Sequence, residues 1–229
     1  MADNPLLPRN RLRELYALMR RVRATDRRRT KSAREALLAA TLIHLSAGDL
    51  VSGRAEDATL RALAPKSKAG EDAHDVPQSL RIPLCAGSAR GMQTAGTDRI
   101  AVAFTDAGTP ETGWADALRW AHRDRLPFLL IVADDGTRVS SKASSRNAPA
   151  LLWPELTKMA HSIHLPHFPA DGEDAVAVFR VVQETSARAR SGGGPSVIWA
   201  MLSSEQLAPS EQPLKRLEAY MATRGIGLQ

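Results

Sequence analysis

The chain has 229 residues, a formal net charge of +6 and a single cysteine. This length suffices for one α/β domain with its own core, whereas one cysteine excludes an intramolecular disulfide framework and a cysteine-based zinc cluster. Hydrophobic residues make up 43% of the chain, as in globular proteins, and no apolar stretch approaches the length of a membrane span. Because the N-terminal residues also lack the apolar region of a signal peptide, we expect a cytoplasmic protein that does not enter a membrane.

The N-terminal part of the chain predicts two helices and holds much of the basic excess. Apolar residues at helical spacing predict a helix over residues 9–28, capped by Asn10, and a second, buried helix over 33–45. Residues 20–34 carry eight Arg and Lys against one Asp. Such a run can bind nucleic acid, an acidic partner or phosphate, but its composition favours a solvated helix face followed by a basic loop. No aromatic residues interleave with these charges and no nucleic-acid-binding motif follows, so we expect no nucleic-acid partner.

The next part of the chain is polar and then rich in small residues. Residues 52–78 carry few large apolar side chains and predict a loop. Residues 79–96 are rich in Ala, Gly and Ser and predict a helix that lets a neighbouring backbone come close. This helix, over 84–95, either packs inside its own domain or lies at a subunit interface, and the sequence leaves both possibilities open.

The second half of the chain alternates apolar runs with amphipathic segments. The short apolar runs predict buried parallel strands over residues 99–104, 127–134 and 196–202. The amphipathic segments predict helices over residues 113–125, 174–190 and 213–224. Strands and helices that alternate in this way predict an α/β fold with a mainly parallel sheet.

Two of the predicted strands end in aspartates. Asp106 follows one strand, and Asp134 and Asp135 end the next. Ligands of parallel α/β sheets bind at the carboxyl ends of the strands, and carboxylates there favour a hard cation such as Mg²⁺. The backbone N–H groups of Ala107 and Gly108 are candidates for binding phosphate.

A simpler interpretation of the same residues is structural. Asp106 can cap the following helix, and residues 134–136 can form a turn without any ligand. His161, His164 and His167 share one short segment whose spacing resembles a metal site. No carboxylate or cysteine pattern completes that site, so we expect these histidines to be structural or exposed.

The segment FTDAGTPETGWADALRWAHRDRLPFLLIVADDGTRVS resembles the alpha subunit of the first component of thiamine diphosphate-dependent 2-oxo acid dehydrogenases, of the pyruvate, branched-chain and acetoin type. In that family Gly-Asp-Gly ends one strand and Asn-Asn ends the next, and the aspartate and second asparagine bind the metal. Residues 105–107 stand in place of the first motif and residues 134–135 in place of the second, at the family's spacing. Further segments resemble the family in order along the chain, including Gly48 and Asp49 before a strand.

The resemblance implies a thiamine diphosphate-binding fold, with a parallel sheet in three layers and helices on both faces. The chain would be one domain, 1–229, with a basic helical segment (1–32), a shortened loop (52–78) and a C-terminal helix (203–229). The cofactors implied are thiamine diphosphate and Mg²⁺. The implied metal ligands are Asp106, Asp135 and the carbonyl of Thr137. The implied cofactor contacts are Ala107, Gly108, Gly136, Arg54, Val76 and Gln78.

The sequence also departs from the family, as a shortened member would. Residues 203–212 contain no histidine where the family carries a catalytic one, so no catalytic residue is assigned. Alanine at position 107 fits only if its φ is negative, and aspartate at position 135 adds charge beside the metal. The resemblance implies an alpha-type subunit that forms oligomers and needs a beta-type partner. The alternatives are a non-catalytic relative with a structural or regulatory role, and a basic nucleic-acid-binding protein.

Overall fold

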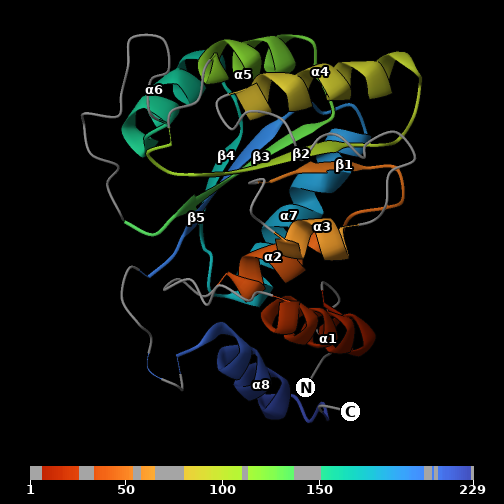
Figure 1. The fold of residues 1–229 in the computed structure, drawn as a ribbon, viewed down its shortest axis with the longest axis vertical. Coiled ribbons are helices and arrows are strands. Elements are labelled where there is room, and N and C mark those ends of the chain that lie inside the picture. Colours follow the sequence, from red (N-terminus) through yellow and green to blue (C-terminus); the bar gives the residue numbers. More distant parts are fainter. Residues whose placement is uncertain are drawn as a thin grey trace.

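The computed structural model describes residues 7–25, 34–53, 58–64, 80–109, 113–136, 151–203, 208 and 211–227. At its centre lies a five-stranded parallel sheet, with helices on both faces (Figure 1). The strands are β1 (Leu50–Ser52), β2 (Ala101–Asp106), β3 (Phe128–Asp134), β4 (His167–Asp171) and β5 (Ser196–Met201), in the order β1-β2-β3-β5-β4. The predicted fold class, a parallel sheet in three layers, is confirmed.

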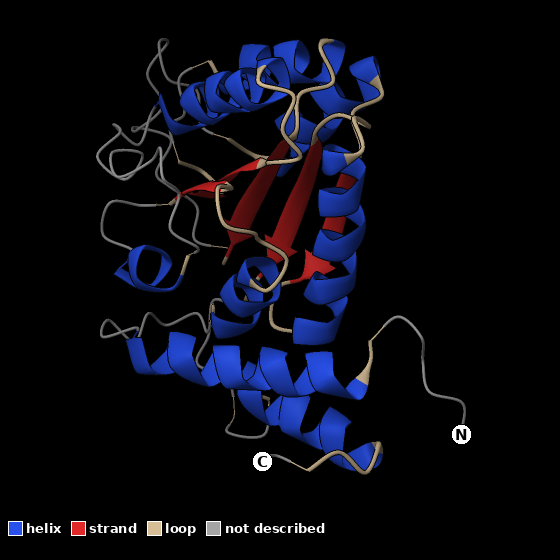
Figure 2. Cartoon of the chain, turned by 90° about the vertical axis from the view of Figure 1, so that its right-hand side faces the viewer, coloured by secondary structure: helices blue, strands red, loops and turns tan. Residues whose placement is uncertain are grey.

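Five of the described helices form the two layers that cover the sheet, and others pack beyond them. The described helices are α1 (Arg9–Thr25), α2 (Glu35–Leu42), α3 (Ala58–Leu63), α4 (Arg81–Thr94), α5 (Trp114–Arg123), α6 (Trp153–Ile163), α7 (Ala175–Arg190) and α8 (Pro213–Thr223). Helices α4, α5 and α6 cover one face of the sheet, and α2 and α7 lie on the other (Figure 1). Helices α1 and α8 pack on each other and on α2, beyond the sheet (Figure 2). None of the helices in the described ranges is long and apolar enough to cross a membrane.

The central strands are buried on both faces, and alternate side chains enter two separate cores. On β3, Leu129 and Ile131 join the core beneath α1, α2, α7 and α8, while Leu130 and Val132 join the core beneath α4, α5 and α6. This alternation follows from the two-residue period of a strand, and it explains why β2, β3 and β5 are continuous apolar runs rather than alternating ones.

Several predicted boundaries shift in the structure. Helix α1 begins at Arg9, where the amide of Leu12 donates to the carbonyl of Pro8 at 3.1 Å, so Asn10 lies inside the helix and is not its cap. Helix α4 begins at Arg81, before the predicted start at residue 84. Part of the predicted loop 52–78 is the helix α3, whose Leu60 is fully buried. Residues 26–33 and 65–79, which include much of the basic run and of this loop, lie outside the described residues.

A buried ion pair fastens the start of β1 to the end of α7. The side chain of Asp49 is completely buried, and its Oδ2 accepts from Arg190 Nη2 at 2.5 Å. The same carboxylate accepts from the amides of Ser46 (2.7 Å) and Ile100 (2.9 Å). Arg190 also donates to the carbonyls of His44 and Asp98. One carboxylate therefore joins the loop before β1, the residue before β2 and the last residue of α7.

Candidate functional site

The two aspartate-bearing strand ends lie side by side. Strands β2 and β3 pair in parallel, with Asp106 opposite Ala133, so the carboxyl end of each strand meets the other at one edge of the sheet. Asp135 follows two positions beyond Ala133 along the chain. The expectation that the two strand ends lie together is confirmed, and they define the candidate site.

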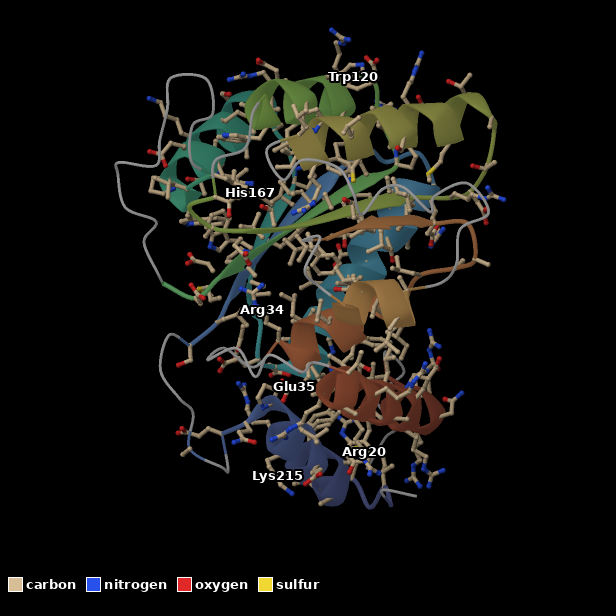
Figure 3. The ribbon with its side chains drawn as sticks, in the orientation of Figure 1. Arg20, Arg34, Glu35, Trp120, His167 and Lys215 are labelled. Carbon is tan, nitrogen blue, oxygen red and sulfur yellow. The ribbon has the colours of Figure 1, made fainter. Side chains whose placement is uncertain are left out.

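An arginine from another element reaches Asp106. Arg34 Nη1 lies 2.7 Å from Asp106 Oδ1, and the Asp106 side chain is only 13% exposed. Arg34 precedes the first turn of α2 and lies between that helix and the sheet (Figure 3). Together they line a small pocket whose wall also includes Leu37, Leu38, Phe104, Thr105 and Ala133. The guanidinium supplies the positive charge that a carboxylate at a strand end requires.

Asp106 does not cap the helix that follows it. Helix α5 begins at Trp114, and its N-cap residue is Gly113, whose φ of 67° is in the left-handed region. Gly113 has no side chain that could cap this helix. The alternative interpretation of Asp106 as a helix cap is therefore wrong, because the helix starts eight positions further along the chain.

The amides predicted to bind phosphate already donate to carbonyl groups of the chain. The amide of Ala107 donates to Ala133 O at 2.8 Å, and that of Gly108 donates to Leu151 O at 2.7 Å. Leu151 in turn donates to Thr109 O at 3.0 Å. A phosphate can use the amides of Ala107 and Gly108 only after these bonds break, so the expectation of two available donors is corrected. Ala107 is not among the residues with positive φ, so its methyl group fits the backbone there.

Asp134 and Gly136 form a turn at the end of β3. Asp134 Oδ1 accepts from the amide of Gly136 at 3.0 Å, and its Oδ2 accepts from Trp199 Nε1 at 2.9 Å. Gly136 has a φ of 69°, which suits glycine in a turn. The predicted turn is confirmed, and it commits Asp134 and the amide of Gly136 to the local structure. Asp135, between them, is half-buried.

Four predicted site residues cannot be placed. Arg54, Val76, Gln78 and Thr137 lie outside the described residues, and their roles remain predictions.

Two arginines near the site were missed by sequence reasoning. Arg34 belongs to the basic run, and nothing in that run distinguishes the one residue that pairs with Asp106. Arg81, at the start of α4, is 1% exposed and donates to the carbonyl of Phe104 on β2 at 3.2 Å. An arginine inside the apolar segment SLRIPLCAG was the available signal, because arginines are rarely buried without a partner.

The three histidines do not form a metal site with neighbouring acids. The rings of His161 and His167 pack edge to face, with their centroids 4.9 Å apart. The centroid of the His167 ring lies 5.8 Å from that of the Trp153 ring. His164 ends α6 in the left-handed conformation, with φ 56°. Within the described ranges, no group of three or more His, Cys, Asp and Glu side chains could hold a metal ion.

The side chains at the strand ends are of the type that binds divalent cations, but Asp106 already forms an ion pair with Arg34. Carboxylates are the ligands that Mg²⁺ prefers, and Asp106 and Asp135 supply two of them. The guanidinium of Arg34 lies 2.7 Å from one oxygen of the Asp106 carboxylate, so a cation that binds Asp106 would compete with this positive charge. The strand ends therefore carry donors of the right kind, beside a guanidinium that already neutralises one of them.

A parallel sheet covered by helices on both faces, with acidic residues at neighbouring strand ends, places this chain among the α/β proteins, whose ligands bind at the carboxyl ends of the strands. The family model of the dehydrogenase E1 component matches residues 72–202, more than half of the chain. The chain belongs to this family.

Relatives of known name agree with this assignment. The chain is 28% identical over 114 residues to the pyruvate dehydrogenase E1 component subunit alpha of Staphylococcus epidermidis, covering 49% of this chain and 30% of that protein. It is 30% identical over 127 residues to the 3-methyl-2-oxobutanoate dehydrogenase subunit alpha of Mycobacterium tuberculosis, covering 55% of this chain and 34% of that protein. The matches thus span about a third of the relatives' length.

A solved structure shares the fold. A provisionally assigned thiamin diphosphate-dependent enzyme from Mycobacterium smegmatis superposes with a TM-score of 0.51 at 14% identity. The superposition covers 86% of this chain and 32% of that one. At this identity the likeness supports the fold alone.

Proposed function

We propose that this chain acts as an alpha-type subunit of a thiamine diphosphate-dependent 2-oxo acid dehydrogenase and holds the Mg²⁺-diphosphate end of the cofactor. The observation that carries the proposal is the family match over residues 72–202, which includes both acidic strand ends. These ends lie on neighbouring strands, as a shared cation requires. A beta-type chain would complete the cofactor site, and the assembly would act on a 2-oxo acid.

Each candidate residue has a role in this proposal. Asp106 and Asp135, with the carbonyl of Thr137, would hold Mg²⁺. The remaining predicted contacts to the cofactor are Ala107, Gly108, Gly136, Arg54, Val76 and Gln78. Thiamine diphosphate supplies the stabilisation of a carbanion, and the protein supplies position and electrostatics.

Binding would be favoured by a rearrangement at the strand ends. Metal binding would be favoured if Arg34 released Asp106, and a phosphate would use the amides of Ala107 and Gly108 only after they released the carbonyls of Ala133 and Leu151. A movement of the start of α2 would accomplish the first of these changes, because Arg34 directly precedes that helix.

A second candidate function is that of a non-catalytic relative with a structural or regulatory role. The Arg34–Asp106 ion pair favours it, because the chain's own cation takes the place of the metal. The lack of histidine in residues 203–212 favours it as well. Both functions share the fold, and they differ in whether the strand ends bind a cofactor.

A calorimetric titration with thiamine diphosphate and Mg²⁺ distinguishes the two, carried out with and without a beta-type chain. Cofactor binding that disappears in Asp106→Ala and strengthens in Arg34→Gln would support the first function. Asp116→Ala serves as the control, because this aspartate is exposed on α5 and pairs only with Arg119 among the described residues. No binding by any variant, even with the beta-type chain added, would favour the non-catalytic relative.

The proposed assembly would use the small-residue helix α4. Its Ala86 and Ala89 are fully buried within the domain, whereas Leu84 is 47% exposed and Gly87 and Gly91 are exposed. One face therefore packs within the domain, and we assign the other to contact with a second subunit. Gly87→Arg should prevent association without unfolding the chain, because a Cβ at this position meets nothing within 4 Å. Light scattering would detect the change, and an unaltered mass would refute this contact.

A cytoplasmic location remains part of the proposal.

A further inference from the structure

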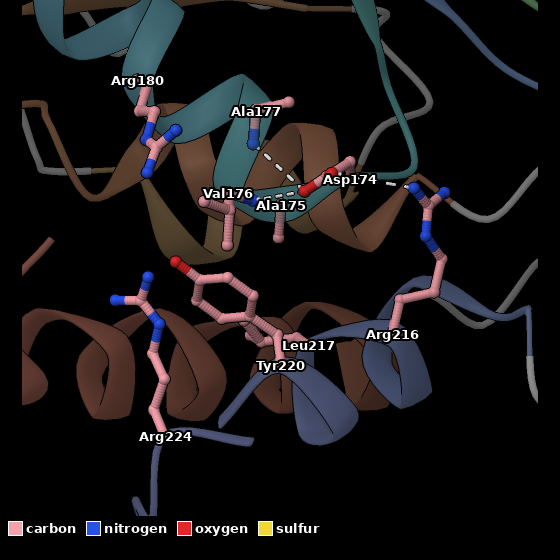
Figure 4. A pocket seen from close by; sticks show the side chains of 9 residues that line it. All are labelled: Asp174, Ala175, Val176, Ala177, Arg180, Arg216, Leu217, Tyr220 and Arg224. Carbon is pink, nitrogen blue, oxygen red and sulfur yellow. Dashed lines mark hydrogen bonds and ion pairs between the residues drawn. The ribbon is translucent and has the colours of Figure 1, made fainter. Parts of the chain in front are cut away.

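A second cavity, lined by several arginines, lies near the end of the edge strand β4, which β5 separates from β3 in the sheet. It measures about 360 Å³ and lies between the first turns of α7 and the helix α8 (Figure 4). Three arginines line it, Arg180 from α7, Arg216 from α8 and Arg224 just after α8, together with Tyr220. It shares no residue with the pocket at Asp106.

One of the three arginines is already neutralised. Arg216 Nη2 lies 2.8 Å from Asp171 Oδ2 and 3.7 Å from Asp174 Oδ2. The hydrogen bond with Asp171 raises the pKa of Arg216, and burial opposes this rise. Asp174 Oδ1 also caps α7 by accepting from the amides of Val176 and Ala177. The charge of Arg216 and the amides of Val176 and Ala177 are therefore already engaged within the chain.

The other two arginines are available. No hydrogen bond or ion pair with a described residue engages the guanidinium of Arg180 or of Arg224. Arg224 is held in place by the ring of Tyr220, since its Cζ lies 4.5 Å from the ring centroid. The hydroxyl oxygen of Tyr220 is buried and has no hydrogen-bond partner among the described residues. Figure 4 shows this hydroxyl directed toward the space between Arg180 and Arg224.

We propose that this cavity binds the phosphate group of a small phosphate monoester. Two guanidinium groups without counterions offer two positive charges and several N–H donors in planar forks, which match the geometry and charge of a phosphate dianion. The hydroxyl of Tyr220 adds one more donor and removes the cost of leaving a buried polar atom without a partner. The cavity is larger than a phosphate ion, and Val176 and Leu217 give it an apolar wall for a small organic group.

The test is calorimetric titration of the whole chain with glycerol phosphate, inorganic phosphate and acetate at constant ionic strength. We expect the monoester to bind more tightly than inorganic phosphate, and acetate to bind least. Because one charge-assisted hydrogen bond is worth a factor of roughly ten or more in affinity, Arg180→Gln and Arg224→Gln should each weaken binding at least about tenfold. Tyr220→Phe removes only the hydroxyl and should weaken binding by a smaller factor.

Arg188→Gln is the matched control. Arg188 lies on the same helix α7, is exposed, and does not line the cavity. Its removal lowers the net charge by the same amount, so it should leave the affinity unchanged. Circular dichroism and thermal melting of each variant would verify that it is folded.

Three results would overturn the proposal. One is the absence of binding of either phosphate compound to the folded wild-type chain. Another is binding that survives in both the Arg180 and the Arg224 variant, or that falls equally in the Arg188 control. The third is much tighter binding of duplex DNA, lost in the same two variants, which would assign this surface to a nucleic acid instead. The titration is independent of thiamine diphosphate, so its failure would not bear on the proposed cofactor site.

Discussion

The buried carboxylate of Asp49 should be one of the most sensitive positions in the chain. Asp49→Ala would leave the guanidinium of Arg190 without its ion-pair partner, and the amides of Ser46 and Ile100 without an acceptor. Removing one member of a buried ion pair costs about 3–5 kcal/mol. For a domain of this size each kcal/mol lowers the melting temperature by roughly 2–4 °C, so we expect a decrease of about 6–20 °C.

Differential scanning calorimetry and urea unfolding would measure this loss. Asp98→Ala is a suitable control, because the Asp98 side chain is exposed and Arg190 binds only its backbone carbonyl. We expect the control to change stability by less than about 0.5 kcal/mol. If Asp49→Ala lost less than about 1 kcal/mol, or no more than the control, the reasoning that this ion pair joins β1, β2 and α7 would be refuted.

Three further predictions concern stability alone. Burial, followed by the charge of Arg11, lowers the pKa of His44 from 6.5 to about 4, so the unfolded chain binds a proton between these values that the folded chain does not. Stability should therefore fall by up to about 3 kcal/mol as the pH drops from 6.5 to 4, and His44→Phe should flatten this slope in urea titrations at several pH values. Asp174→Ala should cost roughly 1 kcal/mol in chemical denaturation by removing the cap of α7, and a loss near zero would contradict the role of its two hydrogen bonds. Gly172→Ala should lower the melting temperature, because the new Cβ would lie 2.8 Å from Leu202 Cδ2 and 3.0 Å from a backbone carbonyl, and an unchanged melting temperature would show that the chain relaxes there freely.

The sequence predicts the central strands well because their burial is visible locally. β2, β3 and β5 are uninterrupted apolar runs between turn residues, which is the pattern of strands covered on both faces. β4 has no such pattern. Its sequence HFPAD is short, contains proline and is only partly buried, as an edge strand can be. Helix α3 was missed as well, because it lies in a polar stretch with few large apolar residues, although its Leu60 is fully buried.

The site was predictable as far as it depended on strand order. Placing Asp106 beside the end of β3 needs only two neighbouring parallel strands. The partner of Asp106 could not be predicted, because Arg34 is one of eight basic residues in its run and only the packing of α2 selects it. The same holds for the amide of Gly108, whose acceptor is the distant carbonyl of Leu151. Local patterns identify candidate ligands, and tertiary contacts decide whether these ligands are available.

The Arg34–Asp106 ion pair has a consequence for the order in which a complex would form. A cation that competes with Arg34 for Asp106 binds best to molecules in which the ion pair is broken. Its apparent affinity is therefore reduced to the extent that the ion pair is formed. A partner subunit that shifts the start of α2 would increase the fraction of molecules with a broken ion pair without contacting the cation. Subunit assembly would then precede cofactor loading, and the free alpha-type chain would be protected from binding stray divalent ions.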